Sequence, residues 1–409
     1  MDDEAGRVLA FPQAPDAIEL RHLRAFVAVA EELNFGRAAE RLYLSQPALS
    51  RQIRALERLV GCDLLRRSTH QVALTLAGEA LLDRARRLLR DVDEAVTATQ
   101  SVGGELATRV ARIWAPLADV ASADADLQEM RAKYEELHAG FSPPPDVVVH
   151  SVNAGGVPGF TVTPPGAGAA ELLYLHGGGY MMGSAYGFRH LAGALAVEAG
   201  TGALVPEYRL APEHPFPAAL EDALRSYAWM LDRGTDPKRV TVAGDSAAGG
   251  LALSLLLSLG DEGLPTPGAV VLFCPSVDLS GATLADAAPD DPSAEPIAQM
   301  ARRAAQGYLA GHPLDDPIVS PLKADLRGLP PLLVQAATGD PVRRDAELLT
   351  ERARGHGVDA RLELYPGTTH GFQMFWSFLP EGADALHAAG AFIRELRRAG
   401  DRAESRRGL

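Results

Sequence analysis

The sequence predicts two domains of different fold class on one chain: a small helical domain, then a larger α/β domain with a mostly parallel sheet. Three observations carry this prediction. At 409 residues the chain is too long for one small core. Residues 17–90 hold 13 Arg against 8 acidic residues, although the whole chain has a net charge of −14. From residue 170 on, short apolar runs alternate with helical stretches, which is typical of a sheet covered on both faces.

Composition and cysteine content indicate what kind of protein this is. Hydrophobic residues make up 47% of the chain, which argues against global disorder, and no apolar run reaches the roughly 18 residues that span a bilayer. We therefore expect no membrane association. The two cysteines, Cys62 and Cys274, suggest no disulfide framework, so a cytoplasmic location is predicted. Residues 1–16 and 399–409 are expected to be disordered tails.

The front of the chain has the pattern of a helix-turn-helix. Helices are expected at 20–33, at about 36–43 and at 46–60, with Ser45 as N-cap and Pro47 in the first turn of the third. The buried face of the third helix would carry Ala48 or Leu49, Ile53, Leu56 and 59–60. In such a motif the N-terminal end of this helix enters the major groove. The candidate contacts with bases and phosphates are Ser45, Gln46, Pro47, Ala48, Ser50, Arg51, Arg54, Arg66 and Arg67. On pattern alone, a structural three-helix domain with solvated arginines stays open.

Residues 26–82 also resemble the winged helix-turn-helix of LysR-type transcriptional regulators. The similarity covers the first helix, the segment SQPALSRQI, the wing around 66–74 and the LTxAG motif; Leu65 departs from it, where the family usually has Phe. The resemblance implies a DNA-binding domain over 17–77 whose partner is double-stranded DNA.

A linker helix is predicted over 78–102. Its apolar residues alternate in steps of three and four, as in a coiled-coil seam: Leu82, Ala85, Leu89, Val92, Val96 and Thr99. The LysR-type resemblance implies that this helix forms a homodimer, while packing against its own domain is the alternative. Residues 103–116 look like the approach to the first strand of the sensor domain usual in that family. The sequence then diverges, so 103–124 is interpreted as a junction to a different domain.

The α/β domain carries its chemical motifs at the ends of its predicted strands, at 171–175, 203–208, 239–243, 269–274, 332–336 and 361–365. Ser246 stands in Gly-Asp-Ser-Ala-Ala between a strand and an apolar helix, the context of a nucleophile elbow. The glycines after His176 can offer backbone N–H groups to an oxyanion. Asp340 and His370 follow in the chain order of an α/β-hydrolase triad.

Several alternatives accompany these motifs. Ala248 stands where the elbow usually has Gly, which weakens the serine motif taken alone. The glycine-rich loop could cradle a phosphate, although no GxGxxG or GKT/GKS motif accompanies it. Asp340 could instead cap a helix, and Asp345 is a rival carboxylate. Three other histidines have no comparable context and are expected to be surface or packing residues: His190, His214 and His356.

The strings LYLHGGGY, EYRLAPEHPFPAALEDA, VAGDSAAGG, GDPVRRDAELL and YPGTTHGF together resemble the hormone-sensitive-lipase-type esterases, an α/β-hydrolase family. The resemblance covers about 125–398 and implies Ser246 as nucleophile, His370 as general base and Asp340 as its partner. The implied oxyanion donors are the N–H groups of Gly177, Gly178, Gly179 and Ala247. It also implies a helical cap at about 125–145, joined by 297–309; a helix docked elsewhere is the alternative. No cofactor and no metal are expected.

The predicted function is a DNA-binding transcriptional regulator fused to an active serine esterase, which hydrolyses small carboxylic esters through an acyl-enzyme. Two alternatives remain: a regulator whose hydrolase fold only senses a ligand, and an esterase with a vestigial DNA-binding domain.

Overall fold

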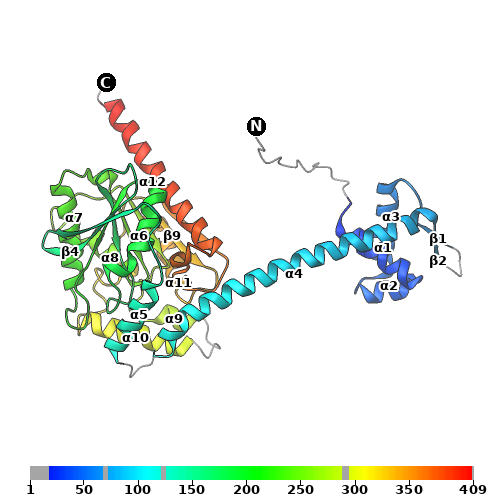
Figure 1. Ribbon diagram of the computed structural model, residues 1–409, viewed down its shortest axis with the longest axis horizontal. Coiled ribbons are helices and arrows are strands. Elements are labelled where there is room, and N and C mark those ends of the chain that lie inside the picture. Colours follow the sequence, from blue (N-terminus) through cyan, green and yellow to red (C-terminus); the bar gives the residue numbers. More distant parts are fainter. Residues whose placement is uncertain (1–17, 68–71, 121–125, 288–293, 408–409) are drawn as a thin grey trace. The chain divides into compact units, whose positions relative to one another are not determined.

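The structure is a computed structural model that describes residues 18–67, 72–120, 126–287 and 294–407. The chain divides into two compact units, Met1–Glu105 and Leu106–Leu409 (Figure 1). The predicted combination of a helix-turn-helix with an α/β-hydrolase fold is confirmed. The unit boundary falls inside a helix.

The smaller unit is a helix-turn-helix with a two-stranded wing. Its elements are α1 (Leu20–Glu32), α2 (Phe35–Arg41), α3 (Gln46–Val60), β1 (Leu65–Arg67) and β2 (Val72–Leu74), the last two antiparallel. As predicted, Ser45 caps α3, its hydroxyl accepting a hydrogen bond from Ala48 N–H at 3.4 Å. The core-facing residues of α3 are Leu49, Ile53 and Leu56, each fully buried.

One predicted core position of α3 is wrong. Val60 is 39% exposed, because the helix ends beside it at Gly61, whose φ of 79° only glycine adopts without strain.

The linker helix is longer than predicted. Helix α4 (Leu76–Ala118) runs through the glycines at 103 and 104 and through the segment interpreted as the approach to a strand. Residues Val110, Trp114 and Leu117 lie at helical spacing and pack into the core of the larger unit. This packing offsets the cost of a glycine in a helix, about 1 kcal/mol relative to Ala. The predicted junction 103–124 therefore belongs to a helix over most of its length.

The first half of the predicted coiled-coil seam packs within its own unit, against the helix-turn-helix. Ala85 is fully buried, and Leu82 and Leu89 pack against the same core of the smaller unit. Arg86 of α4 also donates two hydrogen bonds to Glu31 of α1, at 2.8 and 2.9 Å. This is the alternative left open for these three seam residues. The side chains of Val96 and Thr99 lie outside the described residues.

The larger unit is built on an eight-stranded sheet in the order β10-β9-β8-β7-β5-β6-β4-β3. The strands are β3 (Val148–Ala154), β4 (Val157–Thr163), β5 (Ala170–Leu175), β6 (Gly202–Pro206), β7 (Thr241–Asp245), β8 (Ala269–Phe273), β9 (Leu332–Ala337) and β10 (Ala360–Tyr365). All neighbours from β10 to β6 pair parallel, and β4 pairs antiparallel with both β3 and β6. The six predicted strands are present, while the hairpin β3–β4 was not predicted.

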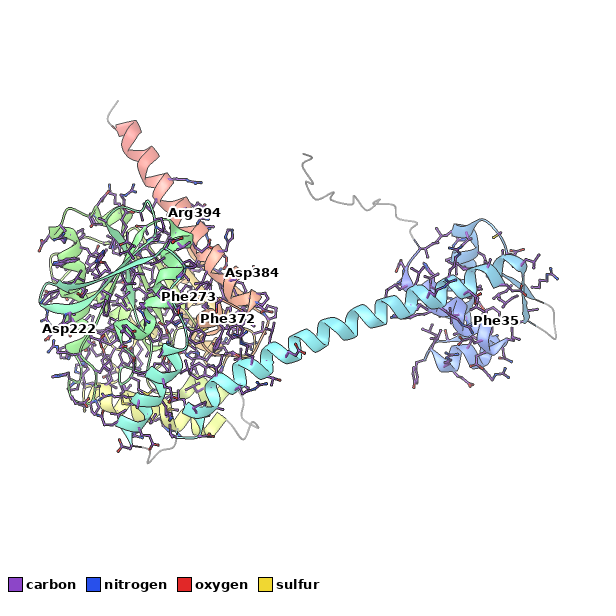
Figure 2. All side chains as sticks on the ribbon, viewed as in Figure 1. Phe35, Asp222, Phe273, Phe372, Asp384 and Arg394 are labelled. Carbon is purple, nitrogen blue, oxygen red and sulfur yellow. The ribbon has the colours of Figure 1, made fainter. Side chains whose placement is uncertain are left out.

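Helices cover both faces of this sheet, since every residue of the central strands β7, β8 and β9 is buried. Apart from the two helices described below, the helices that follow β4 are α6 (Ala185–Ala199), α7 (Ala218–Asp232), η1 (Pro237–Arg239), α8 (Ala247–Ser258), α9 (Ala282–Ala287), η2 (Pro321–Lys323), α11 (Arg343–Gly355), η3 (Phe372–Phe375) and α12 (Pro380–Arg407). Helix α12 packs against α6, and α7 against α8. Phe273 and Phe372 fill the interior between sheet and helices (Figure 2).

The two segments predicted as a cap are helical, α5 (Leu127–Ala139) and α10 (Ala294–Leu309), and they lie beside the end of α4 (Figure 1). They touch each other, since Arg303 of α10 contacts the sulfur of Met130 at 3.9 Å.

Among the described residues, none of the helices has the length and apolar character needed to cross a bilayer.

Candidate active site

Ser246 lies on the sharp turn between β7 and α8, in a conformation that non-glycine residues rarely adopt, with φ 53° and ψ −126°. The surroundings hold this turn. Ser246 N–H donates to the carbonyl of Phe273 at 2.9 Å, and the carbonyl of Ser246 accepts from Ser276 N–H at 2.9 Å. The turn therefore lifts the hydroxyl to the carboxyl end of the sheet, as the sequence predicted.

The neighbours of Ser246 are small because the turn leaves no room. A Cβ at Gly244 would lie 2.4 Å from the carbonyl oxygen of Ala248, and one at Gly249 would lie 2.6 Å from Pro275. Ala248 itself is buried and tolerated. The departure from the usual glycine therefore leaves the turn intact.

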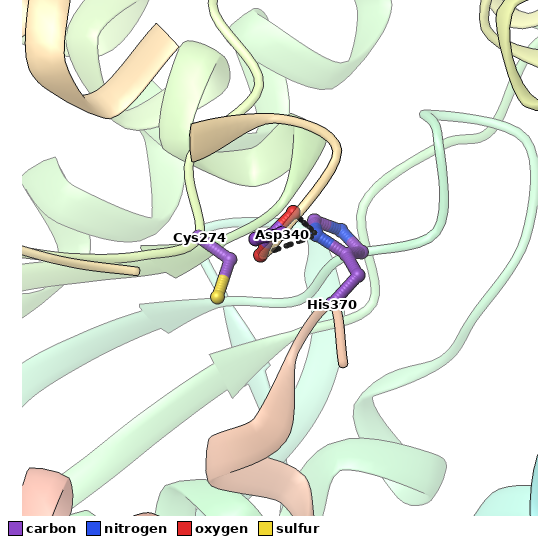
Figure 3. A group of neighbouring side chains, drawn as sticks. All are labelled: Cys274, Asp340 and His370. Atoms are coloured by element: carbon purple, nitrogen blue, oxygen red, sulfur yellow. Dashed lines mark hydrogen bonds and ion pairs between the residues drawn. The ribbon is translucent and has the colours of Figure 1, made fainter. Parts of the chain in front are cut away.

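The three predicted catalytic side chains form one hydrogen-bonded relay. His370 Nε2 lies 2.8 Å from Ser246 Oγ, and His370 Nδ1 lies 3.0 and 3.1 Å from the two oxygens of Asp340. Figure 3 shows the imidazole facing the carboxylate of Asp340. Val342 N–H donates to the same carboxylate at 2.9 Å and fixes its orientation.

The charges of His370 and Asp340 shift each other's pKa toward the ionised forms. Burial acts to lower the pKa of His370, but the charge of Asp340 and its hydrogen bond outweigh burial and raise that pKa. Burial acts to raise the pKa of Asp340, but the nearby charge of His370 and the hydrogen bonds lower it overall. Asp340 is thus held ionised, and its charge favours the protonated form of His370.

The segment His176–Tyr180 follows β5 and contacts Asp245, the residue before Ser246; it carries the predicted oxyanion donors and is here called the oxyanion loop. Its backbone is unusual, with positive φ at Gly178 (122°), Gly179 (63°) and Tyr180 (61°). Among the described residues, no acceptor bonds the backbone N–H groups of Gly178, Gly179 or Ala247. These three donors are available to a ligand.

One predicted oxyanion donor is wrong. Gly177 N–H donates to Asp245 Oδ1 at 2.9 Å, and a Cβ at Gly177 would lie 2.1 Å from the other oxygen of that carboxylate. The donor is already satisfied by a buried acceptor, so it cannot also bind an oxyanion.

Asp245 is a site residue that the sequence analysis missed. Its buried carboxylate also accepts a hydrogen bond from Tyr174 OH at 2.8 Å. Burial raises the pKa of Asp245 to about 7 against the lowering effect of these two donors. The available signal was an acidic residue ending a strand whose other residues are apolar, because such a charge is buried only where donors hold it.

The rival residues lie elsewhere. Asp345 accepts hydrogen bonds from Val277 N–H and Asp278 N–H, at 2.7 and 2.9 Å, and so holds a loop. His190 is buried 3.4 Å from His138, His356 accepts from Leu326 N–H at 2.9 Å, and His214 is exposed. Their surface or packing positions match the expectation.

A cluster of Cys274, Asp340 and His370 has its potential metal-ligand atoms within 4.8 Å of one another (Figure 3). The donor set does not fit a metal. Both ring nitrogens of His370 are engaged in the relay, and burial raises the pKa of the Cys274 thiol well above its usual value. A protonated thiol is a poor ligand, so the cluster is better described as part of the relay.

The predicted DNA-contact residues gather at the start of α3 and on the wing. Exposed residues are Ser45, Gln46, Pro47, Arg51, Arg54 and Arg66, while Ala48 and Ser50 are half-buried. Arg51, Arg54 and Arg58 line one groove on this surface. Arg67 ends β1, and its side chain lies outside the described residues.

Comparison with known proteins identifies relatives of both units. The sequence family described as an alpha/beta hydrolase fold matches residues 172–374, and the lysR family of bacterial regulatory helix-turn-helix proteins matches residues 20–79. An acetyl-hydrolase of Streptomyces hygroscopicus is 39% identical over 277 residues, 66% of this chain and 90% of that protein. An esterase of Acinetobacter venetianus is 30% identical over 268 residues, 65% of this chain and 88% of that protein. The crystal structure of an esterase from the bacterial hormone-sensitive lipase family is similar with a TM-score of 0.65 at 38% identity, covering 70% of this chain and 97% of that one.

Proposed function

Since this chain belongs to the hormone-sensitive-lipase type of α/β-hydrolases and carries a LysR-type helix-turn-helix, we propose that it is a transcriptional regulator fused to an active esterase. The larger unit is a serine carboxylesterase-type hydrolase. We propose Ser246, His370 and Asp340 as its triad, with small carboxylic esters as substrates. The relay from Ser246 Oγ through His370 to Asp340 is the observation that carries this proposal.

The mechanism follows from the geometry. His370 Nε2 takes the proton of Ser246 as Oγ attacks the ester carbonyl carbon, and the carbonyl oxygen becomes an oxyanion. The N–H groups of Gly178, Gly179 and Ala247 donate to that oxyanion. The imidazolium of His370 then protonates the departing alcohol, which leaves an ester of Ser246.

Deacylation repeats these steps with water. His370 takes a proton from water as the water oxygen attacks the acyl carbon, and then returns the proton to Ser246 Oγ as the carboxylic acid leaves. Fixed N–H dipoles contribute most where charge develops, so loss of one donor lowers the rate by about 10²–10³-fold.

Substituting the nucleophile tests the enzymatic half. We expect Ser246→Ala to lower the rate of p-nitrophenyl butyrate hydrolysis by about 10⁶-fold. Ser258→Ala is the matched control, because Ser258 lies on the same helix and, within the described residues, its hydroxyl bonds only the carbonyl of Ser254, at 2.9 Å. Wild-type protein that is as inactive as Ser246→Ala would favour the ligand-sensor alternative.

The regulatory half rests on the exposed arginines of α3, Arg51 and Arg54. We propose that this unit binds double-stranded DNA, and that the protein acts in the cytoplasm, where the chromosome is, as the dimer that the LysR-type resemblance implies. Arg51→Ala and Arg54→Ala should each weaken binding to the chain's own upstream region and flatten its salt dependence. Arg87→Ala, an exposed arginine on α4, is the control. Absence of binding by the wild type at low salt would favour a vestigial domain.

A further inference from the structure

Arg131 of the cap helix α5 holds the main chain at two places near the active site. Its Nε donates to the carbonyl of Met181 at 2.7 Å, and Nη2 donates to the carbonyl of Ala211 at 2.9 Å. The two Nη atoms also bind both carboxylate oxygens of Glu213 at 2.7 Å. This side chain is only 19% exposed, so most of its hydrogen-bonding capacity is used inside the protein.

The two carbonyls that Arg131 binds belong to segments that fix the oxyanion loop. Met181 N–H donates to the carbonyl of Gly178 at 3.1 Å, and Ala211 N–H donates to the carbonyl of Tyr180 at 2.9 Å. The guanidinium therefore closes a ring of hydrogen bonds around residues 178–181.

This loop needs external support. Three consecutive residues, Gly178, Gly179 and Tyr180, have positive φ, and Tyr180 is not a glycine. Such conformations persist only where the surroundings determine them. Arg131 supplies that support from an element more than 40 residues earlier in the chain.

We propose that Arg131 is a positioning residue for ester hydrolysis. It acts through Met181 and Ala211 on the N–H groups of Gly178 and Gly179, and does not touch the substrate. The proposal rests on the proposed function, since it assigns those N–H groups to the oxyanion.

The chemistry of the position calls for arginine and for its carboxylate partner. Only a guanidinium presents several donors in a rigid fork, so Lys at 131 would keep the charge but could not bind two carbonyls and a bidentate carboxylate together. The hydrogen bond from Arg131 lowers the pKa of Glu213 to about 2, so Glu213 stays ionised at neutral pH. Glu213 thereby keeps the guanidinium charge balanced and its plane fixed.

The test compares Arg131→Lys, Arg131→Ala and Glu213→Gln with the full-length wild type. Active sites are counted with diethyl p-nitrophenyl phosphate, because each reactive Ser246 forms one Oγ–P bond and releases one p-nitrophenolate. We expect kcat per counted site to fall by about 100-fold in both Arg131 variants, the effect of misplacing a catalytic group by about 1 Å. KM should change little, and affinity for a trifluoromethyl ketone transition-state analogue should fall in parallel with kcat.

A purely structural role gives a different result. The Arg131 variants would then have a lower Tm and fewer countable sites, but a wild-type kcat at each site, and that outcome overturns the proposal. If Arg131→Ala does not fold, Arg131→Lys and Glu213→Gln still allow kcat per counted site to be measured. Lys133→Ala is the matched control, since Lys133 of the same helix pairs only with Glu136 in the described structure, at 2.8 Å, and should keep the wild-type kcat.

The two proposals fail in distinguishable ways. Full activity in Ser246→Ala would remove the proposed function itself. An inactive Ser246→Ala together with a wild-type kcat in Arg131→Lys would remove only the role of Arg131.

Discussion

Among single residues, Asp245 links the two halves of the active site. It lies directly before Ser246 and accepts a hydrogen bond from Gly177 N–H, which fixes the start of the oxyanion loop. Its carboxylate is buried and has a pKa raised to about 7. One carboxyl group therefore holds both the turn at Ser246 and the start of the oxyanion loop. Because this group is buried, its ionisation lowers the stability of the folded protein by an amount that depends on pH.

The direction of this pH dependence follows from the number of protons that the folded and unfolded states bind. Unfolded Asp titrates near 3.8, whereas folded Asp245 keeps its proton up to about pH 7. Between these values the folded protein binds more protons than the unfolded chain. The contribution of Asp245 to the free energy of unfolding therefore falls as pH rises from about 4 to about 7, and is constant above that.

Asp245→Asn should remove this pH dependence, because the amide oxygen can accept both hydrogen bonds without ionising. We expect the difference in Tm between variant and wild type to shift in favour of the variant from pH 5 to pH 8, measured by thermal unfolding. Asp261→Asn is an exposed control and should follow the wild type at every pH. An unchanged Tm difference between pH 5 and pH 8 would contradict the assigned pKa.

Single residues also show what sequence can and cannot predict. Ser246, Asp340 and His370 were predictable, because each follows a recognisable strand and the carboxyl ends of parallel strands meet at one edge. The partner of Gly177 was not, because it depends on a carboxylate 68 residues away that becomes buried only in the folded protein. Arg131 was missed for the same reason, because the sequence around an arginine on an amphipathic helix does not show which distant carbonyls it will bind.

Among the elements, the end of α4 is part of the hydrolase. Trp114 packs edge-on against Phe375, with ring centroids 6.3 Å apart, and the guanidinium of Arg109 lies 3.8 Å from the ring centroid of Phe378. Both rings follow His370 closely in the chain. This helix was predicted too short because residues 103–116 resemble the approach to a strand, whereas the burial of Val110 and Leu117 on one face keeps the segment helical. The hairpin β3–β4 was missed because β3 is largely exposed and neither strand has a clean apolar alternation.

Trp114→Ala should destabilise the hydrolase unit by about 2 kcal/mol, less than the roughly 3–5 kcal/mol of a fully buried Trp, because this ring is only partly buried. Unfolding in denaturant, monitored through the loss of esterase activity, measures this difference in the free energy of unfolding. Arg112→Ala, exposed on the same stretch, should stay within about 0.5 kcal/mol of the wild type. Equal stability of the two variants would show that α4 does not belong to this core.

On the scale of the whole molecule, the segments that follow the DNA-binding unit in the chain contact residues next to the catalytic groups. Trp114 of α4 packs against Phe375, five residues after His370, and Arg131 of α5 binds the carbonyl of Met181, directly after the oxyanion loop. These contacts motivate the hypothesis that occupancy of the esterase site alters DNA affinity.

Modification of Ser246 by diethyl p-nitrophenyl phosphate should change the affinity for the upstream DNA at least about fivefold, within the usual range of coupling free energies. Fluorescence anisotropy at fixed salt measures this change. Ser246→Ala treated in the same way is the control and should show none. Equal affinities of modified and unmodified wild type would leave the two activities independent.

The sharing of α4 has a thermodynamic consequence. Its front half completes the core of the smaller unit with Ala85, and its last turns complete that of the larger unit with Val110 and Leu117. Heat that melts the whole of this helix withdraws apolar surface from both cores. The two halves of the protein would then lose their order cooperatively, in overlapping transitions, where a flexible tether would let each melt alone.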